Sequence, residues 1–152
     1  MNRELRSLSA SFRAAFSGIR CCICDERNLR IHLSTVLGVM LISRFYAFTA
    51  LHYAVLTLIF AMVIAVEMLN TAIERVVDLE SPSYHRLAKM AKDIAAGATL
   101  VCAIAAVVIG VLFFCDIDGI RRLLDFMRER TVLFLSCAAG YCLLAFSFIF
   151  LP

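Results

Sequence analysis

Four long hydrophobic segments dominate this chain, and short polar stretches separate them. The segments cover residues 31–51, 53–77, 94–115 and 132–151. The last two contain no charged residue, and each has the roughly 20 residues that a helix needs to cross a bilayer. No alternation of apolar and polar residues typical of strands competes with this pattern. The pattern therefore predicts membrane helices in all four segments.

A different pattern precedes the first hydrophobic segment. Apolar residues recur there at spacings of three and four, at Leu5, Leu8, Phe12, Phe16, Ile19 and Ile23. Arginines repeat every seven residues beside this face, at Arg6, Arg13, Arg20 and Arg27. Cations along the edge of an apolar helix face are typical of a helix that lies in the lipid headgroup layer. We therefore expect an interfacial helix over about residues 3–24, since a soluble-core helix would have no soluble partner to pack against.

Composition agrees with a membrane protein. Hydrophobic residues make up 62% of the 152 residues, charged residues 18%, and the mean hydropathy is +0.89. These values lie far from those of soluble domains. With two prolines and six glycines there is no long linker. The sequence predicts an all-α integral membrane bundle, with an interfacial helix, three core spans and a fourth C-terminal span.

The charges predict which ends of these helices face the cytoplasm. Six arginines crowd the first thirty residues, and four cations lie from the end of the second hydrophobic segment to the start of the third: Arg75, Arg86, Lys89 and Lys92. The positive-inside rule assigns both regions to the cytoplasmic side. Four arginines between 121 and 130 conflict with this topology, because it places them outside. Asp116, Asp118, Asp125 and Glu129 balance them only in net charge.

The second hydrophobic segment carries a polar stripe where it approaches the cytoplasm. Asn70, Glu74 and Asp78 follow Glu67 at offsets of 3, 7 and 11 residues, which return to one face of a helix. A carboxylate at membrane depth is costly and usually functional. The alternative is a stripe that only bonds helix to helix inside a bundle. We interpret the stripe as an active site.

Depth separates the expected roles within the stripe. Glu67 and Glu74 are seven residues apart, about 10 Å along a helix, so they are not expected to hold one ion as direct neighbours. Glu67 is deep, where desolvation makes a carboxylate a stronger base for a lipid hydroxyl. Glu74 and Asp78 are near water, where a carboxylate can hold Mg²⁺ together with water and phosphate.

A third helix is expected to begin at Ser81–Pro82, a suitable N-cap and first-turn pair. Its early residues His85, Lys89, Lys92 and Asp93 form a basic region suited to a polyphosphate. The alternative is a set of interfacial anchors. Small residues at 95–98 would allow close helix contact and bring Lys92 near the Glu74 end of the stripe.

Other chemistry is not indicated. Seven cysteines are present, but the cluster Cys21, Cys22 and Cys24 has no second pair at zinc-finger spacing. The chain lacks the glycine-rich loops of soluble nucleotide-binding folds. Any nucleotide site must therefore be of a different kind.

Two motifs resemble a known family. The sequence EMLNTAIERVVD at 67–78, followed by YHRLAKMAKD at 84–93, is similar to the prokaryotic diacylglycerol kinases, which include the undecaprenol kinases. The segment ERNLR at 26–30 and the helix at 11–19 extend the resemblance, which covers about residues 5–115.

The resemblance implies a small membrane kinase that uses Mg²⁺ and ATP, with active sites shared between the subunits of a homotrimer and no nucleic-acid partner. It implies Glu67 as the general base and Glu26 and Glu74 as metal ligands. The residues implied at the nucleotide are Glu26, Asn70, Glu74, Ser83, Tyr84, His85, Lys92 and Asp93. The implied location is the inner membrane, with the site at the cytoplasmic face. Ala14 departs from the family, which often has an aromatic residue there.

The resemblance favours undecaprenol as the lipid, because LAKMAKDIAAGA at 87–98 is more similar to the undecaprenol kinases. Diacylglycerol is the alternative substrate. A non-catalytic transport or assembly subunit is the alternative class of protein. We divide the chain into a kinase domain, residues 1–115, and an appended amphipathic segment with a fourth span, residues 116–152.

Overall fold

The computed structural model describes residues 3–80 and 85–150, and the side chains among these from residue 8 onward. Helices account for nearly all of this described part, and no strand occurs in it. The elements are α1 (Arg3–Asp25), α2 (Arg27–Ile42), the 3-10 turn η1 (Ser43–Phe45), α3 (Ala50–Glu80), α4 (Arg86–Phe114), α5 (Ile117–Glu129) and α6 (Thr131–Phe150). The predicted all-α class is confirmed.

Three of these helices, α3, α4 and α6, are long and apolar enough to cross a membrane. The helix in the first predicted span differs from expectation, since α2 has 16 residues and ends at Ile42 rather than near residue 51. Ser43 is fully buried, and its hydroxyl donates to the carbonyl of Met40 at 2.8 Å. Tyr46 then packs edge-on against Phe114 at 4.8 Å between ring centroids. Aromatic packing in the turn therefore replaces the last helical turns that hydropathy predicted.

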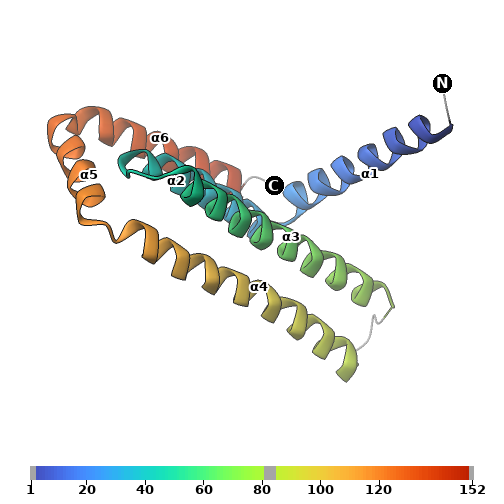
Figure 1. Ribbon diagram of the computed structural model, residues 1–152. Coiled ribbons are helices and arrows are strands. Elements are labelled where there is room, and N and C mark those ends of the chain that lie inside the picture. Colours follow the sequence, from blue (N-terminus) through green and yellow to red (C-terminus); the bar gives the residue numbers. More distant parts are fainter. Residues whose placement is uncertain (1–2, 81–84, 151–152) are drawn as a thin grey trace.

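The longest helices, α3 and α4, pack side by side as a long antiparallel pair (Figure 1). Apolar residues Leu56, Ile59 and Val63 of α3 are buried, as are Ala95 and Cys102 of α4. The small residues on α4 allow this close approach of two helix backbones. The pair supplies the rigid support on which the polar stripe lies.

Helix α1 leaves this bundle and points away from it (Figure 1). Its apolar face is open, with Phe12 64% and Phe16 69% exposed. An uncovered aromatic face on an arginine-rich helix is what a helix in the headgroup layer requires. Its interfacial position remains a prediction.

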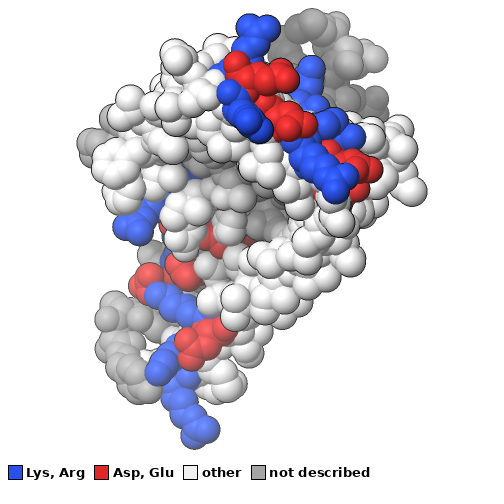
Figure 2. Space-filling view, turned by 90° about the vertical axis from the view of Figure 1, so that its left-hand side faces the viewer, with Lys and Arg blue, Asp and Glu red and all other residues white. Residues whose placement is uncertain are grey.

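The segment after residue 115 docks on the turn between α2 and α3. Gly119 of α5 lies against the ring of Tyr46, and Phe126 meets Phe45 at 5.0 Å between centroids. Arg122 donates to the carbonyl of Phe45 at 2.7 Å. Several charges of α5 group together at this end of the molecule (Figure 2), where Arg122 also lies 3.6 Å from Asp116. Part of the unexpected arginine cluster is thus paired locally.

Helix α6 lies beside α2 and runs back along it (Figure 1). The Tyr141 hydroxyl donates to the carbonyl of Ser34 at 2.7 Å, beside Gly38, where a Cβ would meet the phenol oxygen. The guanidinium of Arg27 lies 5.2 Å from the ring centroid of Phe150. Residue 150 therefore lies at the end of the bundle where α1 meets α2.

Replacing Gly119 by alanine should loosen the docking of α5. A Cβ there would lie 2.2 Å from the ring of Tyr46, which is buried against Phe114. Overpacking of this kind costs about 1–3 kcal/mol. Thermal unfolding in detergent should therefore begin at lower temperature in Gly119→Ala. Gly140→Ala is the matched control, because nothing lies within 4 Å of a Cβ at Gly140; equal loss in both variants would contradict the docking role.

Candidate active site

The polar stripe lies on the inner face of α3, and burial falls along it toward one end. Glu67 is 3% exposed and Asn70 8% exposed. Glu74 is partly exposed, and the Asp78 side chain is 66% exposed. Val63, one turn before Glu67, is buried in the apolar part of the same face. Glu67 thus marks the boundary between an apolar and a polar half of the helix face, as the sequence predicted.

Asn70 links the stripe internally. Its amide nitrogen donates to Glu74 Oε1 at 3.0 Å, which fixes both side chains. Its carbonyl oxygen is buried without a hydrogen-bond partner among the described residues, as is the hydroxyl of Thr99 on α4. A buried polar atom left unpaired costs free energy, so such atoms are often completed by a ligand. The structure therefore leaves an acceptor oxygen at the centre of the stripe.

Lys92 meets the stripe at its Glu74 end, as predicted. Its ammonium group forms an ion pair with Asp78, not with Glu74. Asp78 thereby holds the lysine near the end of the α3–α4 pair where α3 ends and α4 begins. Asp93 follows on α4 and is exposed.

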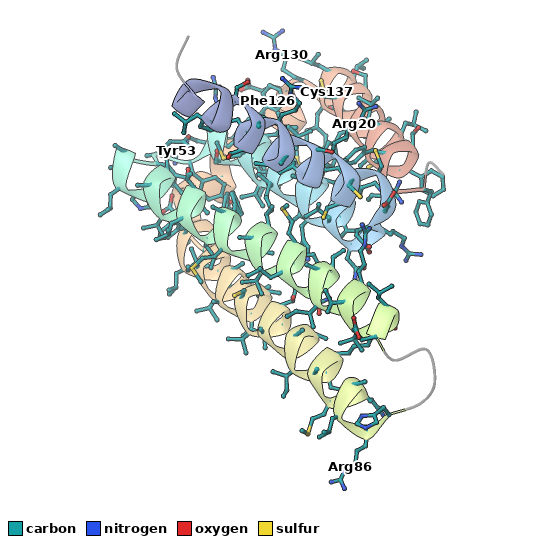
Figure 3. The ribbon with its side chains drawn as sticks, turned by 90° about the vertical axis from the view of Figure 1, so that its right-hand side faces the viewer. Arg20, Tyr53, Arg86, Phe126, Arg130 and Cys137 are labelled. Carbon is teal, nitrogen blue, oxygen red and sulfur yellow. The ribbon has the colours of Figure 1, made fainter. Side chains whose placement is uncertain are left out.

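The start of α4 is defined by His85. His85 has an extended backbone, with φ −133° and ψ 127°, and its carbonyl accepts from the Lys89 amide at 3.0 Å. His85 is therefore the N-cap of α4, which begins at Arg86; the expected start at Ser81–Pro82 lies outside the described residues. Arg86 projects from this free end of the molecule (Figure 3). Ser83 and Tyr84, expected at the nucleotide, lie outside the described residues.

Glu26 reaches α3 from the junction of α1 and α2. It occupies the N-cap position of α2 with extended backbone, but its side chain makes no cap hydrogen bond. Instead Glu26 Oε1 accepts from Arg75 at 3.3 Å. Arg75 follows Glu74 in the chain, so this contact brings the two expected metal ligands to the same end of α3.

Two further side chains of α1 hold Arg75. Asp25 accepts from the guanidinium at 3.0 Å, and the Cys21 sulfur accepts at 3.1 Å. The hydrogen bonds from Cys21 and Arg75 hold the pKa of the Asp25 carboxyl below its usual range. Sequence reasoning missed this cluster, because Arg75 falls off the polar stripe and Asp25 has no distinctive spacing. It appears only when α1 packs on α3.

The donor set suits Mg²⁺. No group of three or more acidic, histidine or cysteine side chains gathers within the described residues. Mg²⁺ at phosphate sites typically uses one or two carboxylates and keeps water and phosphate oxygens for its other positions. Glu74, with the unpaired oxygen of Asn70 on the preceding turn of the stripe, offers such donors, and Glu26 would supply a second carboxylate from the same end of α3.

An apolar groove of about 290 Å³ lies between α2, α3 and α4. Its lining residues are His32, Thr35, Val36, Val39, Phe60, Val63, Ile64, Ala103, Ala106, Val107 and Gly110. Val63 and Ile64 belong to the turn of α3 that immediately precedes Glu67. A hydrocarbon chain in the groove would therefore end beside the buried carboxylate.

Comparison with known proteins identifies relatives for most of the chain. Residues 13–114 match the family described as prokaryotic diacylglycerol kinase. A diacylglycerol kinase of Synechocystis sp. is 47% identical over 105 residues, which cover 68% of this chain and 60% of that protein. An undecaprenol kinase of Bacillus subtilis is 36% identical over 111 residues, which cover 73% of this chain and 90% of that protein. A diacylglycerol kinase of Escherichia coli is 33% identical over 94 residues, which cover 62% of this chain and 77% of that protein.

Proposed function

Because the chain belongs to the prokaryotic diacylglycerol kinase family, we propose that it transfers the terminal phosphoryl group of ATP to the hydroxyl of a membrane lipid. The observation that carries this proposal is the α3 stripe, in which a buried carboxylate lies between an apolar groove and a polar, water-accessible end. Such a boundary is where a lipid alcohol and a phosphate donor must meet. A non-catalytic transport or assembly subunit would not require an apolar groove, a buried carboxylate and a polar end to follow one another along α3.

Glu67 is the proposed general base. The lipid chain would lie in the groove, with its hydroxyl at the turn that carries Glu67. The carboxylate then accepts the hydroxyl proton as the oxygen attacks phosphorus, and the lipid oxygen displaces ADP. General bases of this kind contribute about 10²–10⁴-fold to rate.

The polar end of the stripe is the proposed nucleotide site. Glu26 and Glu74 would hold Mg²⁺, which neutralises charge on the phosphates. Asn70 orients Glu74 through its 3.0 Å hydrogen bond. Lys92, directed by Asp78, supplies a cation for the phosphates, and Asp93, His85, Ser83 and Tyr84 are proposed to complete the nucleotide site. This end is proposed to face the cytoplasm, where ATP is found.

Undecaprenol is the proposed acceptor, with diacylglycerol as the second candidate. The motif at 87–98 favours the first, and the name of the Synechocystis relative favours the second. The open sides of the groove fit either kind of chain. Transfer of labelled phosphate from ATP should be measured in detergent with Mg²⁺, using each lipid in turn. Transfer to neither lipid would contradict the kinase proposal.

We also propose that the enzyme is a homotrimer with shared active sites. On α3, Leu69 is 61% and Val76 60% exposed, alongside the polar stripe. These residues line a second apolar groove, together with Ala72, Ile73 and Val77. Exposed apolar surface at this cytoplasmic end is best covered by another subunit.

Filling the first groove should impair lipid use selectively. Ala106→Phe would place a ring between α2, α3 and α4 without touching the polar stripe. We expect the KM for lipid to rise about tenfold, because the loss of several methylene contacts costs more than 1 kcal/mol. The KM for ATP should remain as in the parent enzyme. Ile104→Phe, on the 55% exposed outer side of α4, is the control; equal effects on both substrates would argue against the groove.

A further inference from the structure

Arg75 is paired with two carboxylates, Asp25 and Glu26, and the proposed metal site uses only Glu26. Arg75 Nη2 donates both to Asp25 Oδ2 at 3.0 Å and to Glu26 Oε1 at 3.3 Å. Its Nη1 donates to Cys21 at 3.1 Å, and the Cys21 thiol in turn donates to the same oxygen of Asp25 at 3.2 Å. Asp25, Cys21 and the Arg75 guanidinium are thus each hydrogen-bonded to the other two. Glu26 is bonded in this cluster only to Arg75, and it shares the Nη2 donor with Asp25.

Resting on the metal site proposed above, we propose that Asp25 is a positioning residue that keeps Arg75 paired and thereby leaves Glu26 available to Mg²⁺. A guanidinium and a metal ion compete for the same carboxylate, and an unpaired cation nearby repels the metal. With Asp25 in place, Glu26 can turn toward the metal while Arg75 retains two partners. Arg75 continues to hold α1 against α3.

The backbone around Glu26 permits its side chain to rotate from Arg75 toward the metal. Glu26 is the single extended residue between α1 and α2, with φ −104° and ψ 111°. Asp25 instead ends α1, and its partner Cys21 lies one helical turn earlier. Asp25 is therefore held by the helix, whereas the Glu26 side chain serves as no helix cap. The hydrogen bond from Arg75 to Glu26 is longer than the one to Asp25, and it is the bond that Mg²⁺ binding would replace.

Removing the charge of Asp25 should raise the Mg²⁺ requirement. In Asp25→Asn, Glu26 becomes the only charged partner of Arg75 in the cluster, so the Mg²⁺ concentration for half-maximal activity should rise about three- to tenfold. Turnover at saturating Mg²⁺ should change much less. Binding of Mn²⁺ with a non-hydrolysable ATP analogue, measured by electron paramagnetic resonance, should weaken by a similar factor.

The double variant Asp25→Asn/Arg75→Gln separates this role from simple docking of α1. Removing the competing cation should restore metal affinity toward that of the parent, even though the contact between α1 and α3 is lost. A double variant no better than Asp25→Asn would overturn the proposal and leave only a docking role. So would an unchanged Mg²⁺ requirement in Asp25→Asn.

Two controls complete the experiment. Glu80→Gln removes a negative charge from the exposed end of α3 outside the cluster and should leave the Mg²⁺ requirement unchanged; a rise equal to that of Asp25→Asn would overturn the proposal in favour of a general charge effect. Glu26→Gln should raise the requirement strongly. If it does not, Glu26 is not a metal ligand, and the proposed metal site fails together with the role of Asp25 that rests on it. An unchanged requirement in Asp25→Asn alone, with Glu26→Gln raising it, would overturn only the role of Asp25.

Discussion

Glu74→Gln should abolish phosphoryl transfer while leaving the protein folded in the membrane. The substitution removes the charge of the proposed metal ligand with little change in shape, and the glutamine oxygen can still accept from Asn70. Loss of a charged ligand removes several kcal/mol of transition-state stabilisation, on the order of 10²-fold or more in rate. The rate should be measured with labelled ATP at high Mg²⁺, in protein shown by its melting temperature to be intact.

Glu80→Gln provides the matched comparison, since it removes the same charge six residues further along α3. It should retain the parent rate. Parent-like activity in Glu74→Gln would remove Glu74 from the metal site, whereas unfolding of that variant would show that the stripe serves the bundle rather than the chemistry.

Helical periodicity was sufficient to predict the stripe. Spacings of three and four place Glu67, Asn70 and Glu74 on one face, and hydropathy gives their order of depth. The structure buries the first two and partly exposes the third, as this argument requires. These features depend only on positions within one helix, which the sequence specifies directly.

Contacts between helices were predicted less well. Lys92 was placed correctly at the Glu74 end of the stripe, but its pairing with Asp78 depends on the register of α4 against α3, which spacing does not specify. Likewise, hydropathy cannot tell that Tyr46 leaves the helix to pack against Phe114. The Arg75 cluster depends on where α1 meets α3, far apart in the sequence. Each miss is a tertiary contact overriding a local pattern.

Burial explains why the two glutamates of the stripe should have separable roles. Glu67 is buried one turn from the apolar groove, while Glu74 is bonded to Asn70 and partly exposed toward the proposed nucleotide end. A base beside the lipid affects the chemical step, whereas a metal ligand affects nucleotide binding as well. Kinetic constants can therefore distinguish them.

Glu67→Gln should accordingly bind Mg-ATP as the parent does but lose turnover by about 10²–10⁴-fold, because the amide cannot accept the lipid proton. Nucleotide affinity should be measured by calorimetry and turnover at saturating ATP and lipid. Glu67→Asp keeps a base on a side chain one methylene shorter and should recover part of the rate. If instead Glu67→Gln lost Mg-ATP binding while the saturated enzyme still turned over, Glu67 would belong to the metal site, and the division of roles along α3 would have to be reversed.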